Sequence, residues 1–199
     1  MEYTQIRVSS KDDSKRLNRL IAVRGNPNLL ELGAIIGSSF NVWFEHCYLF
    51  KKHKEKTFYV IDSWVEDDIF GYDVSMTESY LSDLDDSFTY EYDTGEGYEF
   101  DCKIFKRKLV HIEDKDEEEY PLAFVVKGVG QGIFENDHGT FWMYLDGDIS
   151  PESTGDEEND IYLPMNMDFE KFGDFDKPLD LSEYIYYQDD IDSVIYQYL

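Results

Sequence analysis

The sequence is poor in cysteine and contains no long apolar run. Its two cysteines, Cys47 and Cys102, lie where apolar and polar residues alternate. Such positions are typical of buried free thiols rather than of a disulfide framework. No apolar run approaches the roughly 20 residues that would cross a bilayer, and the N-terminus lacks the basic start and apolar core of a secretory signal. These absences argue against membrane and secreted classes, and they predict a cytoplasmic protein.

Signatures of catalysis and cofactor binding are absent as well. The chain has no G-x-S-x-G, H-E-x-x-H or C-x-x-C motif, and its four histidines do not have the spacing of zinc ligands. The glycine cluster at 128–132 is followed by neither Lys-Ser/Thr nor a helix signature, so it does not predict a phosphate-binding loop. We therefore assign no catalytic residue, metal site or cofactor from these motifs.

Basic residues are scarce and unevenly distributed. The chain has 18 Lys/Arg against 44 Asp/Glu, for a net charge of −26. Residues 1–61 carry a net charge of +4, and residues 62–199 carry −30. A field of this sign repels nucleic acids and anionic membranes and attracts basic protein surfaces. The same charge can also serve solubility alone, so composition leaves both interpretations open.

Aromatic residues, by contrast, make up 17% of the chain. Between Phe88 and Ile104, apolar and polar residues alternate on both sides of a short turn that holds Gly95 and Gly97. This period of two predicts a β-hairpin with a buried aromatic face, with both glycines at positive φ. Asp93 precedes the glycines, and an Asp in this position usually caps the turn by accepting bonds from backbone N–H groups.

The remaining pattern predicts an α+β fold. Leu29, Leu32, Ile35 and Ile36 recur at helical spacing after the N-cap residue Asn28, which predicts a helix over 29–39. Further strands are expected at 3–8, 16–23, 46–52, 57–61 and 120–127. Together these elements predict a largely antiparallel sheet with a helix packed across it.

Three other segments are more difficult to assign. Residues 62–87 are acidic and are expected to be irregular, with one helical turn at 78–81. Residues 140–145 are apolar throughout and are expected to be buried. From Leu181 onward the spacing fits one or two short amphipathic helices interrupted near 188–190. We therefore divide the chain into an α+β domain, 1–139, and an acidic, aromatic-rich C-terminal extension, 140–199, packed on it.

Three stretches resemble a known family. They are the strand–strand–helix opening L-N-R-L-I-A-V-R-G-N-P-N-L-L-E-L-G-A-I-I, the run F-N-V-W-F-E-H-C-Y-L-F, and the hairpin Y-E-Y-D-T-G-E-G-Y. In this order and spacing they resemble the family named after the third open reading frame of a root-inducing plasmid, whose members are also labelled insertion-element passenger proteins. The resemblance covers roughly residues 3–130, with the tail from about 140 outside it, and it implies an α+β fold with a largely antiparallel sheet.

The chain departs from that family at several positions. Trp43 lies one place later than the family's usual tryptophan, and Glu96 and Tyr98 stand where Asp and Trp are common. After Gly128 the chain lacks the cysteine pair that many members carry. A metal or redox role for that pair is therefore not carried over, and the resemblance implies no particular chemistry.

One candidate pocket comes from the family-like stretches. His46, Tyr48 and Asp93 are candidates to line it, with His46 as a base or ligand. A lone histidine in an apolar strand is more often a structural residue with a satisfied hydrogen bond than a base or ligand. The enzyme alternative, a small-ligand or metal-dependent enzyme of a mobile-element-associated family, depends on this pocket.

The acidic surface supports a different function, that of a non-enzymatic module that binds a basic protein surface. Carboxylates on a rigid scaffold can imitate a phosphate backbone, so one form of this function is inhibition of a nuclease or other nucleic-acid-binding protein of the host. We expect no direct nucleic-acid binding and no membrane binding. The candidate aromatic anchors among the acids are Tyr72, Tyr80, Tyr184, Tyr186 and Tyr187. The predicted contact residues are Asp67, Asp68, Asp83, Asp85, Asp86, Glu117, Glu118, Glu119, Asp156, Glu157, Glu158, Tyr186 and Tyr187.

Overall fold

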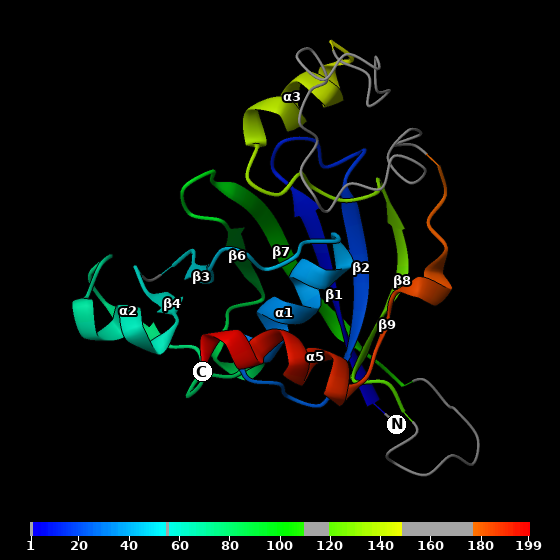
Figure 1. Ribbon diagram of the computed structural model, residues 1–199. Coiled ribbons are helices and arrows are strands. Elements are labelled where there is room, and N and C mark those ends of the chain that lie inside the picture. Colours follow the sequence, from blue (N-terminus) through cyan, green and yellow to red (C-terminus); the bar gives the residue numbers. More distant parts are fainter. Residues whose placement is uncertain (1, 55, 110–119, 149–176) are drawn as a thin grey trace.

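The architecture is a mixed sheet with helices packed on one face. The structure is a computed structural model that describes residues 2–54, 56–109, 120–148 and 177–199. Within these residues one sheet has the strand order β5-β4-β3-β6-β7-β1-β2-β8-β9 (Figure 1). All neighbouring strands are antiparallel except β4 and β5. The strands are β1 (Glu2–Ser10), β2 (Asn18–Arg24), β3 (Tyr48–Lys52), β4 (Phe58–Val60), β5 (Asp73–Ser75), β6 (Ser87–Tyr92), β7 (Tyr98–Leu109), β8 (Ala123–Val129) and β9 (Ile185–Tyr186).

The predicted hairpin is confirmed, and it lies in the middle of the sheet as β6 and β7. Its register places aromatic residues opposite one another, with Tyr90 facing Phe100 and Tyr92 facing Tyr98. These four side chains are buried, because alternation turns one side of each strand toward the helices. The cross-strand aromatic pairs therefore form the centre of the core.

The predicted helix is also confirmed, as α1 (Leu29–Ser39). Asn28 accepts a bond from the backbone N–H of Glu31, and the Glu31 carboxylate accepts one from the backbone N–H of Asn28. This capping box fixes where the helix begins. Gly33 lets the helix lie directly against the Tyr48 ring, whose hydroxyl donates to the Leu30 carbonyl at 2.6 Å.

The acidic stretch 62–87 is more regular than expected. It contains α2 (Asp62–Asp67), strand β5 and the 3-10 turn η1 (Leu81–Asp83), so the turn predicted at 78–81 is placed too early. The pattern misses β5 because this strand has only three residues and pairs in parallel with β4 at the edge of the sheet.

Residues 140–145 lie within α3 (His138–Asp146), and the prediction that they are all buried is wrong. Phe141, Tyr144 and Leu145 are buried, whereas Trp142 and Met143 are exposed. A helix turns its residues through 100° each, so an entirely apolar run cannot all face the core.

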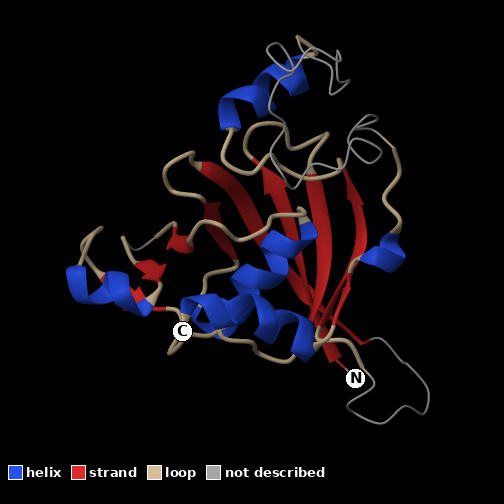
Figure 2. Ribbon diagram, in the orientation of Figure 1, coloured by secondary structure: helices blue, strands red, loops and turns tan. Residues whose placement is uncertain are grey.

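The C-terminal residues complete the same fold. After the 3-10 turn η3 (Leu181–Glu183), strand β9 pairs with β8, and α5 (Gln188–Ile195) contacts α1 on the helical face of the sheet (Figure 2). The predicted interruption at 188–190 is instead the start of α5, while Ile185–Tyr186 extends the sheet. The last turn, η4 (Tyr196–Tyr198), brings the Tyr198 hydroxyl within 2.7 Å of the His46 carbonyl.

Replacing Gly33 tests the close approach of α1 to the sheet. A Cβ at this position would lie 2.0 Å from the Tyr48 ring. Because Tyr48 is fully buried, we expect Gly33→Ala to lower the free energy of unfolding by roughly 1–3 kcal/mol, the usual cost of overpacking. Urea unfolding measures this change.

Gly139 in α3 provides the control, because a Cβ there meets its nearest neighbour at an ordinary 3.8 Å. Gly139→Ala should leave stability unchanged or raise it by up to about 1 kcal/mol. Equal effects of the two substitutions would contradict the packing described here.

Candidate functional site

The turn of the hairpin is organised by Asp93. Its Oδ1 accepts hydrogen bonds from the backbone N–H groups of Gly95 and Glu96, each at 3.2 Å. This is the predicted capping role of Asp93, and it is confirmed. The prediction for the glycines is half wrong, since positive φ occurs at Asp93 (51°) and Gly97 (77°) and not at Gly95. The Asp side chain makes this possible, because its local hydrogen bonds favour the left-handed conformation.

A hollow of about 380 Å³ lies beside this turn. His46 and Asp93 both line it, and His46 Nε2 is 3.7 Å from Asp93 Oδ2. That ring nitrogen also bonds the side-chain oxygen of Asn136, whose amide nitrogen donates to a Glu45 carboxylate oxygen at 2.7 Å. The structure thus brings together two of the three candidate pocket residues, and it adds Asn136 and Glu45 to them.

Tyr48, the third candidate, does not line this hollow. Its side chain is fully buried under α1, and its hydroxyl donates to the Leu30 carbonyl. The cause is strand alternation, since β3 turns Tyr48 toward the helical face. Burial holds the pKa of the Tyr48 hydroxyl well above its usual value, so it is a structural hydroxyl group.

A buried carboxylate behind the hollow was not predicted. Glu135 is almost fully buried and accepts hydrogen bonds from the Tyr92 hydroxyl and from the backbone N–H of Trp43. Burial, followed by this contact with Glu135, raises the pKa of Tyr92 far above its ordinary value. Glu135 lies in a loop with no periodicity, so no pattern in the sequence distinguishes it from the many exposed acids.

The chemistry available in the hollow is limited. Cys47 lines it, but burial raises the pKa of its thiol, which disfavours the nucleophilic thiolate. Among the described residues, no group of three or more His, Cys, Asp or Glu side chains is placed to hold a metal ion. The hollow is therefore a polar recess that can accept hydrogen bonds and positive charge.

A second histidine joins the hairpin turn to α3. His138 Nδ1 lies 2.8 Å from the Glu96 carbonyl, and Nε2 lies 2.8 Å from the Asp12 carboxylate. Its ring packs on Tyr98 with centroids 4.1 Å apart. Burial alone would lower the pKa of His138, but the hydrogen bonds to Asp12 and Glu96 outweigh it and raise the pKa above 6.5. We call this contact between three segments the histidine clamp.

The predicted acidic contact residues fall into two groups. Asp67, Asp68, Asp83, Asp85 and Asp86 lie in or near α2 and η1. The remaining acids lie outside the described residues, and they are Glu117, Glu118, Glu119, Asp156, Glu157 and Glu158.

The two predicted tyrosine contacts also differ from each other. Tyr187 is 44% exposed, whereas Tyr186 is buried, as is the expected anchor Tyr184. The prediction that Tyr186 contacts a partner is therefore wrong for this structure. Pairing of β9 with β8 turns Tyr186 inward and Tyr187 outward.

The segment around α2 exposes apolar side chains among its carboxylates. Residues 62–75, which we call the acidic lobe, lie at the end of the sheet remote from β9 (Figure 1). Tyr72 is 79% exposed and Ile69 is 52% exposed, and Phe70 and Val74 are also exposed. Tyr72 was predicted as an aromatic anchor, whereas the other three were not. The signal that identifies them is their interruption of an acidic run, D-D-I-F-G-Y-D-V.

The fold and these sites define an α+β protein with a largely antiparallel sheet, a helical layer and a projecting acidic lobe. The sequence profile of the plasmid pRiA4b ORF-3-like protein family matches residues 2–176, and the chain belongs to that family. The match extends well past residue 130, so the expectation that the tail from about 140 lies outside the family is wrong for residues 140–176. None of the curated proteins matches the sequence.

A solved structure supports the same fold. The protein of unknown function MM3350 from Methanosarcina mazei Go1 superposes with a TM-score of 0.60 at 18% sequence identity, over 80% of this chain and 86% of that one. At this identity the similarity concerns the fold alone. Among the described residues, no helix has the length and apolar character needed to cross a membrane.

The histidine clamp makes a contribution to stability that depends on pH. The pKa of His138 in the folded protein is raised above the unfolded value of 6.5. The stabilisation of the fold by charged His138 is therefore complete below about pH 6 and is lost as pH rises through the folded pKa. We expect His138→Gln to cost roughly 1.5–3 kcal/mol at pH 5.5, the range for hydrogen bonds to charged groups. The cost should shrink toward pH 8.5, as measured by urea unfolding across this range.

A double-mutant cycle isolates the contact between Asp12 and His138. The coupling energy from Asp12→Asn, His138→Gln and the double variant should be favourable at pH 5.5 and smaller at pH 8.5. Coupling that is absent or independent of pH would contradict a charged His138.

Proposed function

We propose that the protein is a non-enzymatic binding module whose acidic lobe docks on a basic surface of a partner protein. The observation that carries this proposal is the exposure of Tyr72, Ile69, Phe70 and Val74 among carboxylates. Contiguous apolar side chains rimmed by charge mark protein interaction sites. The net charge of −26 would then select a basic partner and accelerate the encounter.

The lobe has further properties that suit docking. β5 is the edge strand, so one side of its backbone is unpaired within the described sheet. Phe70 stacks on Phe58, with ring centroids 5.1 Å apart, which holds the Phe70 ring in place. An aromatic side chain held in this way loses little conformational entropy on binding.

The class of partner follows from charge. Proteins that bind nucleic acids present basic grooves, and an acidic surface can occupy such a groove in place of phosphates. We therefore propose a nucleic-acid-binding protein of the host, such as a nuclease, as the target, with inhibition as the result. The mobile-element setting in the family's name and the free cysteines Cys47 and Cys102 are consistent with action in the cytoplasm.

The test compares matched variants of the lobe. Partners captured from host lysate at low salt are identified and purified, and each is then titrated with the Tyr72→Asn variant. Asn is chosen because it tolerates the left-handed backbone at this position, where φ is 69°. We expect about tenfold weaker binding, because a buried aromatic anchor is typically worth more than 1 kcal/mol. Tyr196→Asn, at an equally exposed tyrosine outside the lobe, should bind as the wild type does.

Charge is tested in the same assay. Asp67→Asn/Asp68→Asn should slow association and weaken its salt dependence, because both residues lie on the lobe. Asp146→Asn/Asp189→Asn removes equal charge from other exposed positions and should have a smaller effect. If no partner is captured at low salt, or if both double variants behave alike, the lobe is not the docking surface.

A further inference from the structure

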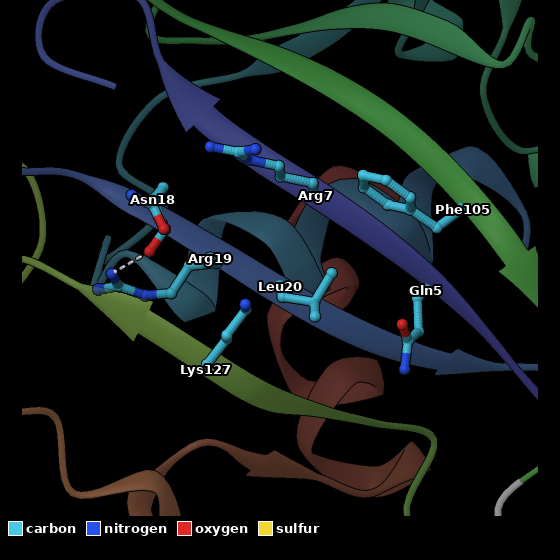
Figure 3. A pocket seen from close by; sticks show the side chains of 7 residues that line it. All are labelled: Gln5, Arg7, Asn18, Arg19, Leu20, Phe105 and Lys127. Atoms are coloured by element: carbon cyan, nitrogen blue, oxygen red, sulfur yellow. Dashed lines mark hydrogen bonds between the residues drawn. The ribbon is translucent and has the colours of Figure 1, made fainter. Parts of the chain in front are cut away.

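A second hollow lies on the opposite face of the sheet, away from α1 and α5. It has a volume of about 330 Å³ and is formed over β7, β1, β2 and β8 (Figure 3). Its lining residues are Gln5, Arg7, Asn18, Arg19, Leu20, Phe105 and Lys127. A volume of this size fits one small molecule and lies at the lower end for ligand sites.

Register explains how these side chains come together. Leu20 in β2 is opposite Arg7 in β1 on one side and opposite Lys127 in β8 on the other. Gln5 faces Phe105 across β1 and β7. Alternation points all five side chains to the same face, and Figure 3 shows Lys127 reaching toward Leu20 between the strands.

The charges on this face are segregated. Toward β3 and β6, the carboxylates of Glu91 and Glu99 are paired with Lys51, and Glu99 also binds Lys11 at 2.9 Å. Over β1 and β8, Arg7 and Lys127 have no carboxylate within ion-pair distance in the described part of the chain. Acids outnumber bases 44 to 18, so two unpaired cations at one hollow indicate a site for an anion.

The rest of the hollow suits a flat organic group. Leu20 forms an apolar floor, and Phe105, which is 39% exposed, lies beside it with the Lys103 ammonium 5.9 Å from its ring centroid. The Gln5 amide makes no hydrogen bond to the described residues, so its donors and acceptor are available. A ring that stacks on Phe105 can place polar atoms near this amide.

The surroundings exclude a long chain as the ligand. β1 and β2 are paired on both sides, so neither offers a free backbone edge to a peptide strand. A net charge of −26 repels an extended polyanion such as DNA. A small anion meets mainly the two local cations.

We infer that this hollow binds a small phosphate-bearing ligand of the nucleoside monophosphate class. Arg7 and Lys127 hold the phosphate, the base packs on Phe105 and Leu20, and Gln5 bonds the edge of the base. An Arg fork matches a phosphate in two places, while Lys supplies a point charge. This site is separate from the acidic lobe.

The test is an NMR titration of the full chain with adenosine 5′-monophosphate. We expect saturable shifts of amide signals in β1, β2 and β8. Adenosine and inorganic phosphate, titrated separately, should each bind at least tenfold more weakly, because each lacks half of the contacts. No saturable shift at millimolar nucleotide, or tighter binding of a single-stranded oligonucleotide than of the mononucleotide, would overturn the inference.

Variants then locate the site. Arg7→Gln and Lys127→Gln should each weaken nucleotide binding at least tenfold, whereas Lys15→Gln, an equal charge change at an exposed turn outside the hollow, should not. Unchanged thermal unfolding midpoints show that the variants fold. Asp67→Asn/Asp68→Asn should bind the nucleotide normally, which separates this result from that of the lobe. Equal nucleotide binding by the wild type and by Arg7→Gln would contradict the proposal that the nucleotide binds in this hollow.

Discussion

The fold depends on a positive charge inside its core. Arg19 is fully buried, and its guanidinium donates to the carbonyls of Ser39 at 2.7 Å, Val129 at 2.6 Å and Gly130 at 2.8 Å. It also lies over the Phe40 ring, 4.7 Å from the centroid. A buried charge is costly unless every donor is satisfied. The planar fork of Arg meets several carbonyls at once, which a Lys ammonium cannot do.

These contacts join segments that are distant in sequence and thereby position the sites. Arg19 connects β2, the end of α1 and the chain that leaves β8. That chain continues past Gly132, where backbone packs closely on Phe40. It then reaches Glu135 behind the hollow at the hairpin turn, Asn136 in the lining of that hollow and His138 in the clamp. On the other face, the same strand β2 presents Leu20 to the second hollow. Arg19 itself is also among the residues that line that hollow.

The sequence pattern predicted those parts of the fold that depend on residues close together in the chain. The hairpin, the helix at 29–39 and the turn role of Asp93 follow from alternation, periodicity and capping. The second hollow was not predictable, because it depends on register between strands far apart in sequence. Glu135 was not predictable either, because it lies in a loop without periodicity. Arg19 left a readable signal, since it occupies an apolar position in the alternation of Leu17, Ile21 and Val23. Strand β5 of the acidic lobe escaped prediction because its three residues are too few to show a period.

Amide hydrogen exchange of the Arg19→Lys variant tests most directly whether the buried guanidinium organises the chain between β8 and α3. The variant keeps a positive charge but loses the fork. We predict that amides from Gly130 to His138 exchange at least tenfold faster than in the wild type, while those of β6 and β7 keep most of their protection. Unchanged exchange in Gly130–His138 would show that other contacts hold this segment, and would contradict the account.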